Sequence, residues 1–232
     1  MLTPKKKISK KEIKQDKLVE TYFKLKTFYD ENQRTILIAV GSIIVFIFLV
    51  VYLVNRSKER DVISTTELGQ VIQLYDQGAY QQAIEGNPAK KIKGLKQIVD
   101  EFGSTESGEI AKIYLANSYL QIGKIDEALF YYEDYDGENP IYQSTALAGA
   151  AACYEIKGDK EKAVNLYLKA AKRNDSEVYA PEYLLNAARL YAELGQKDKS
   201  KKILEQIKTK YPNTQQARDN DRYLAEFGIQ ID

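Results

Sequence analysis

Residues 111–132 read AKIYLANSYLQIGKIDEALFYY, and this stretch decides the fold because its pattern returns twice further along the chain. Three segments superpose without gaps: Leu115-Ala116, Tyr119, Gly123, Ala128, Tyr132; then Ala150-Ala151, Tyr154, Gly158, Ala163, Tyr167; then Ala187-Ala188, Tyr191, Gly195, Ser200, Leu204. Tyrosine and glycine both recur at spacings of 35 and 37 residues. An internal period of this length indicates a stack of similar supersecondary units.

Each recurring residue type suits a helix–turn–helix unit. The small residue at 116, 151 and 188 lets the first helix approach its partner closely, and the small residue at 128, 163 and 200 does the same from the second helix. The tyrosine fills the gap one turn further on. The glycine suits the left-handed position that ends the first helix. Pro181 is expected in a first helical turn, and Pro212 just after a helix end.

This pattern resembles the tetratricopeptide repeat (TPR), a unit of two antiparallel helices, over residues 107–212. The resemblance implies an all-α fold, a TPR α-solenoid with three clear repeats. A degenerate fourth copy is expected upstream at Leu74, Gly78 and Ala83, its second helix interrupted at Gly86-Asn87-Pro88 and resuming from Ala89 to Phe102. The segment Thr214–Phe227 is expected to be one more helix that caps the solenoid. No strand-like alternation follows Glu67.

Residues 35–54, TILIAVGSIIVFIFLVVYLV, predict a single transmembrane helix. The stretch has no charged residue, and fifteen of its twenty residues are Ile, Leu, Val or Phe. A helix of this length spans about 30 Å, the thickness of the hydrocarbon core. Those side chains favour insertion by at most about 4–9 kcal/mol. The run is too long for a cleaved signal peptide and no small-residue cleavage site follows, so we expect a retained signal anchor.

The anchor divides the chain into four expected regions: a basic tail (1–34), the span (35–54), a linker or helix start (55–66) and the TPR-like domain (67–232). In the tail, Ser9 and Glu12 have the spacing of a capping box, and the residues behind them predict an amphipathic helix. Whether that helix lies on anionic lipid or on a partner protein stays open. Residues 1–34 carry ten Lys/Arg, whereas only Arg56, Lys58 and Arg60 follow the span closely. The charge difference predicts a cytoplasmic N-terminus and an extracytoplasmic domain.

The composition argues against enzymatic chemistry. The chain has no histidine, which removes the commonest general base and metal ligand. The single cysteine, Cys153, lies among alanines and is expected to pack in the core. Asp134, Asp136 and Glu138 lack the spacing of a calcium loop. We therefore predict no enzyme activity, no cofactor and no metal. Residues 61–232 carry a net charge of −6, which disfavours nucleic acid as a partner.

What remains is a protein-binding surface. By resemblance to the repeat, a concave groove forms from the first helix of each pair, and nine residues are expected to line it: Ile113, Asn117, Leu120, Ala148, Ala152, Glu155, Leu185, Arg189 and Ala192. Ile113, Thr145 and Gly149 stand where some TPR proteins place cations that grip a carboxylate. The groove is therefore not expected to capture a C-terminal carboxylate.

The order of basic tail, Leu18–Phe23, Asp30-Glu31-Asn32, single span and repeats is similar to the YfgM-like family of bacterial inner-membrane TPR proteins. That resemblance implies an ancillary role at the SecYEG translocon beside a membrane-anchored periplasmic chaperone. An envelope or cell-division scaffold remains an alternative. A third hypothesis, an import receptor with cytosolic repeats, requires the opposite orientation.

Overall fold

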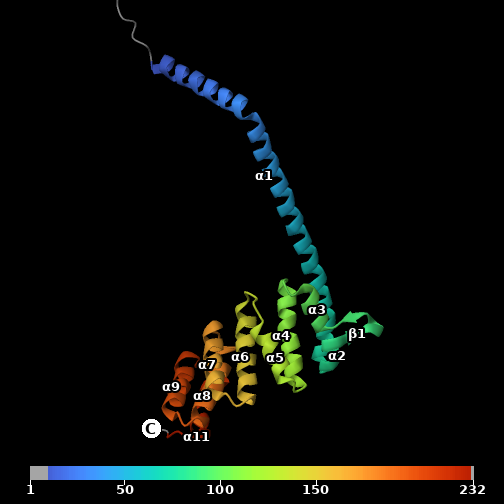
Figure 1. Cartoon of the computed structure of the whole chain (residues 1–232). Coiled ribbons are helices and arrows are strands. Elements are labelled where there is room, and N and C mark those ends of the chain that lie inside the picture. Colours follow the sequence, from blue (N-terminus) through green and yellow to red (C-terminus); the bar gives the residue numbers. More distant parts are fainter. Residues whose placement is uncertain (1–9, 231–232) are drawn as a thin grey trace, which may run out of the picture. The chain divides into compact units, whose positions relative to one another are not determined.

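The computed structural model describes the backbone of residues 10–230 and the side chains of residues 19–230. It divides into two compact units, Met1–Arg56 and Ser57–Asp232. The long helix α1 (Lys10–Asp76) contributes to both units. The described part of the second unit is otherwise built from short helices and one small hairpin (Figure 1). The all-α prediction is confirmed.

The first unit is the N-terminal part of α1. This helix starts at Lys10, as the capping-box spacing predicted, although Ser9 itself lies outside the described residues. Asn32 has non-helical angles (φ −112°, ψ 15°) and bends the helix two residues before the end of the predicted tail. Its side-chain amide donates to the Phe28 carbonyl oxygen over 2.9 Å. The described part of this helix that contains residues 35–54 is long and apolar enough to cross a membrane, and an 18-residue window within it has a mean hydropathy of 3.1.

The second unit begins inside α1. Residues 55–66, which the sequence left open between a linker and a helix start, are helical throughout. The helix then buries Leu68, Val71 and Leu74, which form one wall of the core. Because these residues follow helical spacing, they lie on one face of α1 over about two turns.

The degenerate repeat differs from its prediction in one respect. Its second helix is split into α2 (Tyr80–Glu85) and α3 (Leu95–Phe102), and the second part resumes at Leu95, not at Ala89. Between them lies an antiparallel hairpin of β1 (Gly86–Asn87) and β2 (Ile92–Lys93), closed by the 3-10 turn η1 (Pro88–Lys90). Lys91 takes the left-handed conformation (φ 56°) at the end of this turn, so an α-helix cannot run through residue 91.

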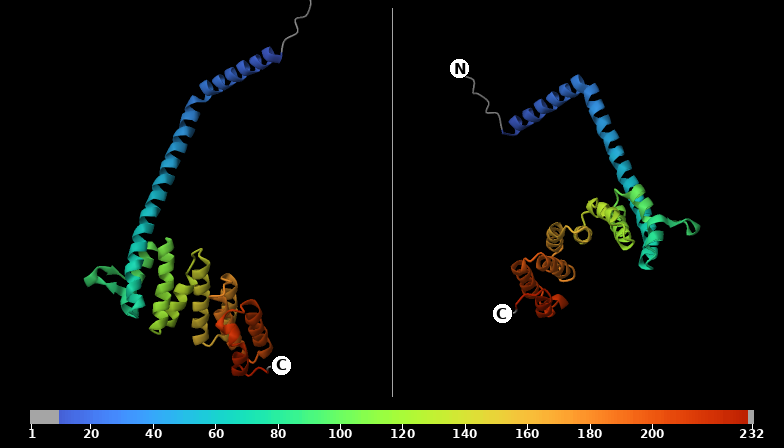
Figure 2. Two further views of the ribbon diagram at one scale, coloured as in Figure 1. Left: turned by 180° about the vertical axis from the view of Figure 1, so that it is seen from behind. Right: turned by 60° about the horizontal axis from the view of Figure 1, so that its bottom comes forward.

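Three helix pairs follow in the order that the repeats predicted. They are α4 (Glu106–Gln121) with α5 (Ile125–Glu133), α6 (Pro140–Ile156) with α7 (Lys160–Arg173), and α8 (Ala180–Glu193) with α9 (Lys197–Lys210). Each helix packs against the next along the chain (Figures 1 and 2). This sequential packing is the architecture of an α-solenoid.

Local sequence sets the helix ends. Gly123, Gly158 and Gly195 all have a φ between 75° and 86°, the left-handed conformation predicted for the end of each first helix. At the starts, the Thr105 hydroxyl and the Asp159 carboxylate each accept a backbone N–H three residues on. Pro140 and Pro181 stand in first turns, where the missing N–H costs nothing.

The core consists of two adjoining clusters of buried side chains. Ala116, Ala151 and Ala188 are all fully buried, as their predicted role at the helix–helix joints requires. The chain ends in α10 (Gln215–Arg218) and α11 (Asn220–Glu226), with Leu224 and Ile229 closing the core. The prediction of one helix over 214–227 is therefore wrong: the helix breaks at Asp219, and the buried Asn220 amide donates to the Leu204 carbonyl oxygen over 2.6 Å.

Candidate protein-binding surfaces

The nine predicted groove residues occupy the same three positions on α4, α6 and α8. Ile113 is only 2% exposed and belongs to the core, so its side chain offers no surface. The other eight are half-buried: Asn117, Leu120, Ala148, Ala152, Glu155, Leu185, Arg189 and Ala192. Leu120, Ala148 and Leu185 also pack against the core clusters. The first-helix face is therefore a half-covered surface of mixed character.

A chain of ion pairs crosses this face. One guanidinium nitrogen of Arg189 donates to both carboxylate oxygens of Glu155, over 2.8 and 2.9 Å. Its other nitrogen donates to Glu193 over 2.7 Å, and Lys160 completes the chain at 2.8 Å from Glu193. Burial alone would lower the pKa of Arg189, but the hydrogen bonds to Glu155 and then Glu193 outweigh it and raise that pKa. The pairs join α6, α7 and α8 across two repeats.

Asn117 is likewise engaged by its neighbours. The Tyr132 hydroxyl on α5 donates to its side-chain oxygen. The Tyr132 ring also lies directly over Gly149 on α6, where an added Cβ would overlap the ring. Burial is the main reason why the pKa of Tyr132 is strongly raised. The polar side chains of the predicted groove thus already have partners within the chain.

Two clefts have a lining that includes residues of the second helices. One has a volume of about 340 Å³ and is lined by residues of α5, α6 and α7, including Tyr132, Leu147 and Leu166, with Arg173 at its edge. The other, of about 230 Å³, lies between α7 and α9 over Leu168 and Leu184. None of the nine predicted groove residues lines either cleft.

The described residues include no group of His, Cys, Asp or Glu side chains placed to hold a metal ion. Asp134, from the acidic turn, pairs with Lys112 over 2.8 Å. Cys153 is fully buried, and burial raises the pKa of its thiol to about 11. A thiol with a raised pKa and no access to solvent is a poor nucleophile.

Comparisons with known proteins agree with the repeat architecture. A family model described as "Tetratricopeptide repeat" matches residues 182–214, which include most of α8 and all of α9. The fold of the second unit is a TPR-type solenoid. A comparison with curated protein sequences finds no match.

Solved structures give the same result. A crystal structure of nearly identical TPR-like repeats, from a Podosopora anserina protein assigned as a kinesin light chain, superposes with a TM-score of 0.55 at 19% identity. The match covers 70% of this chain and 84% of that one. A point variant of the same protein matches at 18% identity with the same TM-score and coverage. At this identity the likeness supports the fold alone.

Sequence reasoning missed the clefts between the second helices. A signal was present: Arg173 and Lys210 are 37 residues apart, the spacing of the last two repeats, and each closes a second helix. The lysine-rich composition of α7 and α9 is a second signal of this kind.

Proposed function

We propose that this protein is a membrane-anchored TPR adaptor of the bacterial inner membrane, with an N-terminal cytoplasmic tail and a periplasmic solenoid that binds other proteins. A TPR-type solenoid is a scaffold for protein–protein interaction. More specifically, we propose that it lies beside the SecYEG translocon, which its similarity to the YfgM-like family supports. There it would hold a membrane-anchored periplasmic chaperone or an emerging polypeptide.

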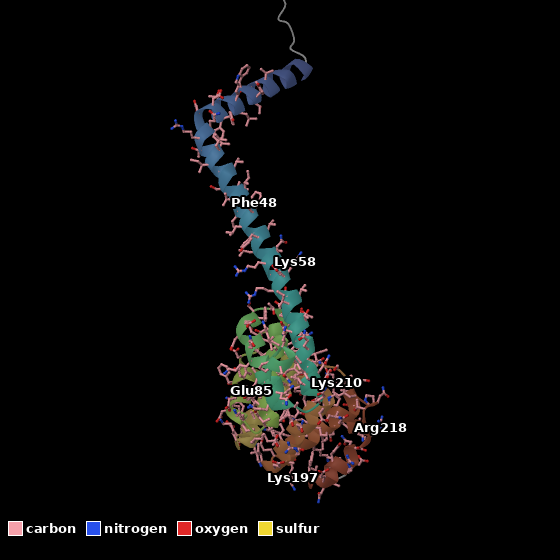
Figure 3. The ribbon with its side chains drawn as sticks, turned by 90° about the vertical axis from the view of Figure 1, so that its right-hand side faces the viewer. Phe48, Lys58, Glu85, Lys197, Lys210 and Arg218 are labelled. Atoms are coloured by element: carbon pink, nitrogen blue, oxygen red, sulfur yellow. The ribbon has the colours of Figure 1, made fainter. Side chains whose placement is uncertain are left out.

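The observation that carries the proposal is the exposure of the apolar stretch. Between residues 37 and 54 the large apolar side chains are 42% (Val50) to 72% (Phe48) exposed, and Phe48 stands out from the helix in Figure 3. None of the residues in the 18-residue apolar window of this segment is buried against the rest of the described chain. A continuous exposed apolar surface of this size requires a non-aqueous environment.

Topology is tested by adding protease to spheroplasts that express the chain with a C-terminal tag. We expect loss of the tag and survival of a fragment containing the tail and span. In intact cells the tag should persist, which controls for protease leakage. Protection of the tag until the membrane is dissolved would reject the periplasmic orientation and favour a cytosolic receptor or scaffold.

Partners are tested by purifying the tagged chain in mild detergent. We expect translocon subunits and a periplasmic chaperone to co-purify, whereas recovery of cell-division or envelope-assembly proteins would favour the scaffold alternative. The proposed first-helix groove is tested with Ala192→Glu, because Ala192 is half-buried and a carboxylate there obstructs the surface. Ala89→Glu on the exposed hairpin is the matched control. If both variants retain the partner equally, the groove assignment is rejected.

A further inference from the structure

The second helices of the three repeats differ sharply in charge. The helix α5 carries three acidic residues and no basic one. By contrast, α7 carries five Lys/Arg against one Glu, and α9 carries six Lys against one Asp and one Glu. Since residues 61–232 have a net charge of −6, this positive charge is concentrated on one part of an otherwise acidic domain. Lys197 and Lys210, labelled in Figure 3, mark the two ends of α9.

The α7–α9 cleft lies within this basic region. Leu168 and Ala171 from α7 and Leu184 from α8 form its apolar floor, and polar side chains make up the rest of its lining. Lys172 and Lys210 line it from α7 and α9. Its volume of about 230 Å³ lies below the range of about 300–1,000 Å³ that is usual for small-molecule pockets.

The cleft already holds one carboxylate from the chain itself. Asp175 accepts hydrogen bonds from the Lys210 ammonium and from the Tyr211 hydroxyl. These bonds, first from Lys210 and then from Tyr211, lower the pKa of Asp175. The site therefore has the geometry to bind a carboxylate beside leucine side chains.

Other cations of the cleft have no such partner. Lys172 lines the same cavity and forms no ion pair within the described part of the chain. Two exposed lysines outside the cleft lining also form no ion pair in the described chain: Lys169, one turn before Lys172, and Lys202, one turn before Gln206. Lys172 thus lines the cleft, and Lys169 and Lys202 lie on the helices beside it, all three exposed and without an ion-pair partner in the described chain.

We infer that the α7–α9 cleft binds an acidic segment of a partner protein in which apolar side chains alternate with carboxylates. The apolar side chain packs on Leu168 and Leu184, and its neighbouring carboxylates pair with Lys172 and the flanking lysines. This surface is separate from the proposed first-helix groove, so the chain has two faces for protein partners. It extends the proposed function but does not depend on the membrane orientation.

Charge and shape favour a peptide over the other polyanions. Binding of single-stranded nucleic acid relies on exposed aromatic faces, whereas Tyr211, the aromatic residue of this cleft, is only 4% exposed. A lipid headgroup layer meets protruding cations but does not reach a recessed apolar floor. An alternating acidic and apolar segment satisfies both the lysines and the leucines.

The test measures binding of a fluorescein-labelled peptide of repeated Asp-Leu-Glu units to the full chain in zwitterionic nanodiscs. The variant replaces Lys169, Lys172 and Lys202 by Gln. Its matched control replaces Lys90, Lys91 and Lys96 by Gln, exposed lysines of the hairpin region and α3. Loss of three exposed charge pairs with the peptide should weaken binding about tenfold in the first variant. The control variant loses no such pair, and its binding should weaken less than about twofold.

Two further probes separate the contributions of charge and apolar contact. A peptide of Asp-Ser-Glu units should bind at least about tenfold more weakly, because it lacks the apolar side chain. Equal binding of the two peptides, equal losses in the two lysine variants, or binding of phosphatidylglycerol vesicles without binding of the peptide would each overturn the inference. A failed topology test together with intact peptide binding would reject only the location of the adaptor.

Discussion

The first-helix and second-helix faces of the same repeats differ in how many of their charged residues are paired within the chain. On the first-helix face, Glu155, Arg189 and Glu193 are joined to one another. On the second-helix face, Lys169, Lys172 and Lys202 have no ion-pair partner in the described chain, and a cleft opens between α7 and α9. The contrast shows that a repeat fixes the position of side chains but not whether they stabilise the solenoid or remain available to a partner.

The largest expected effect is a difference in stability between two variants of α6, one at a buried helix–helix joint and one on the surface. Ala151 is fully buried between helices, whereas Ala152, its neighbour, is half-buried on the first-helix face. Ala151→Leu should lower the free energy of unfolding by about 1–3 kcal/mol through overpacking. Ala152→Leu should change it by less than about 0.5 kcal/mol. Thermal unfolding of the full chain in mild detergent measures both.

Equal losses in these two variants would mean that residues 151 and 152 do not differ in burial as the solenoid requires. The repeat register would then be shifted by one residue. A register error of this kind would also displace every predicted position of the groove.

The next effect concerns the ion pair that joins α6 to α8. A double-mutant cycle with Glu155→Gln and Arg189→Leu should give a coupling of about 1 kcal/mol, because the pair has two hydrogen bonds but both side chains remain partly exposed. The same cycle on Lys208 and Asp221, an exposed pair at 3.3 Å, should give no resolvable coupling. Similar values for the two pairs would contradict the distinction between the faces.

Much of the fold could be predicted from sequence because the repeat combines several local signals. Gly123, Gly158 and Gly195 each end a first helix in the conformation that glycine favours, and Ala151 and Ala188 are buried at the expected joints. Such signals lie within one helix pair. They therefore appear in the sequence at a fixed spacing and need no knowledge of distant contacts.

The missed features depend on contacts between distant residues or on irregular backbone. The hairpin at residues 86–93 depends on the left-handed conformation of Lys91, which lysine rarely adopts. The pairing of Glu155 with Arg189 joins residues 34 positions apart, and helical periodicity does not reveal it. The α7–α9 cleft is formed by three helices together, so no single segment predicts its volume.

The smallest expected effect is a loss of stability at high pH that is caused by the buried Cys153 in the core. Burial raises the pKa of the Cys153 thiol to about 11 in the folded chain, whereas an unfolded thiol has a pKa of about 8.5. Because the folded state favours the neutral thiol, its contribution is complete below about pH 8.5 and is lost as the pH rises toward 11. At about pH 9 the loss should be below about 1 kcal/mol relative to neutral pH. In Cys153→Ala that loss should be absent, whatever the stability of the variant at neutral pH. Parallel pH profiles of the two proteins would show that the thiol is already hydrated in the folded state, and that the joint between α6 and its neighbours is more open than the fully buried Cys153 side chain indicates.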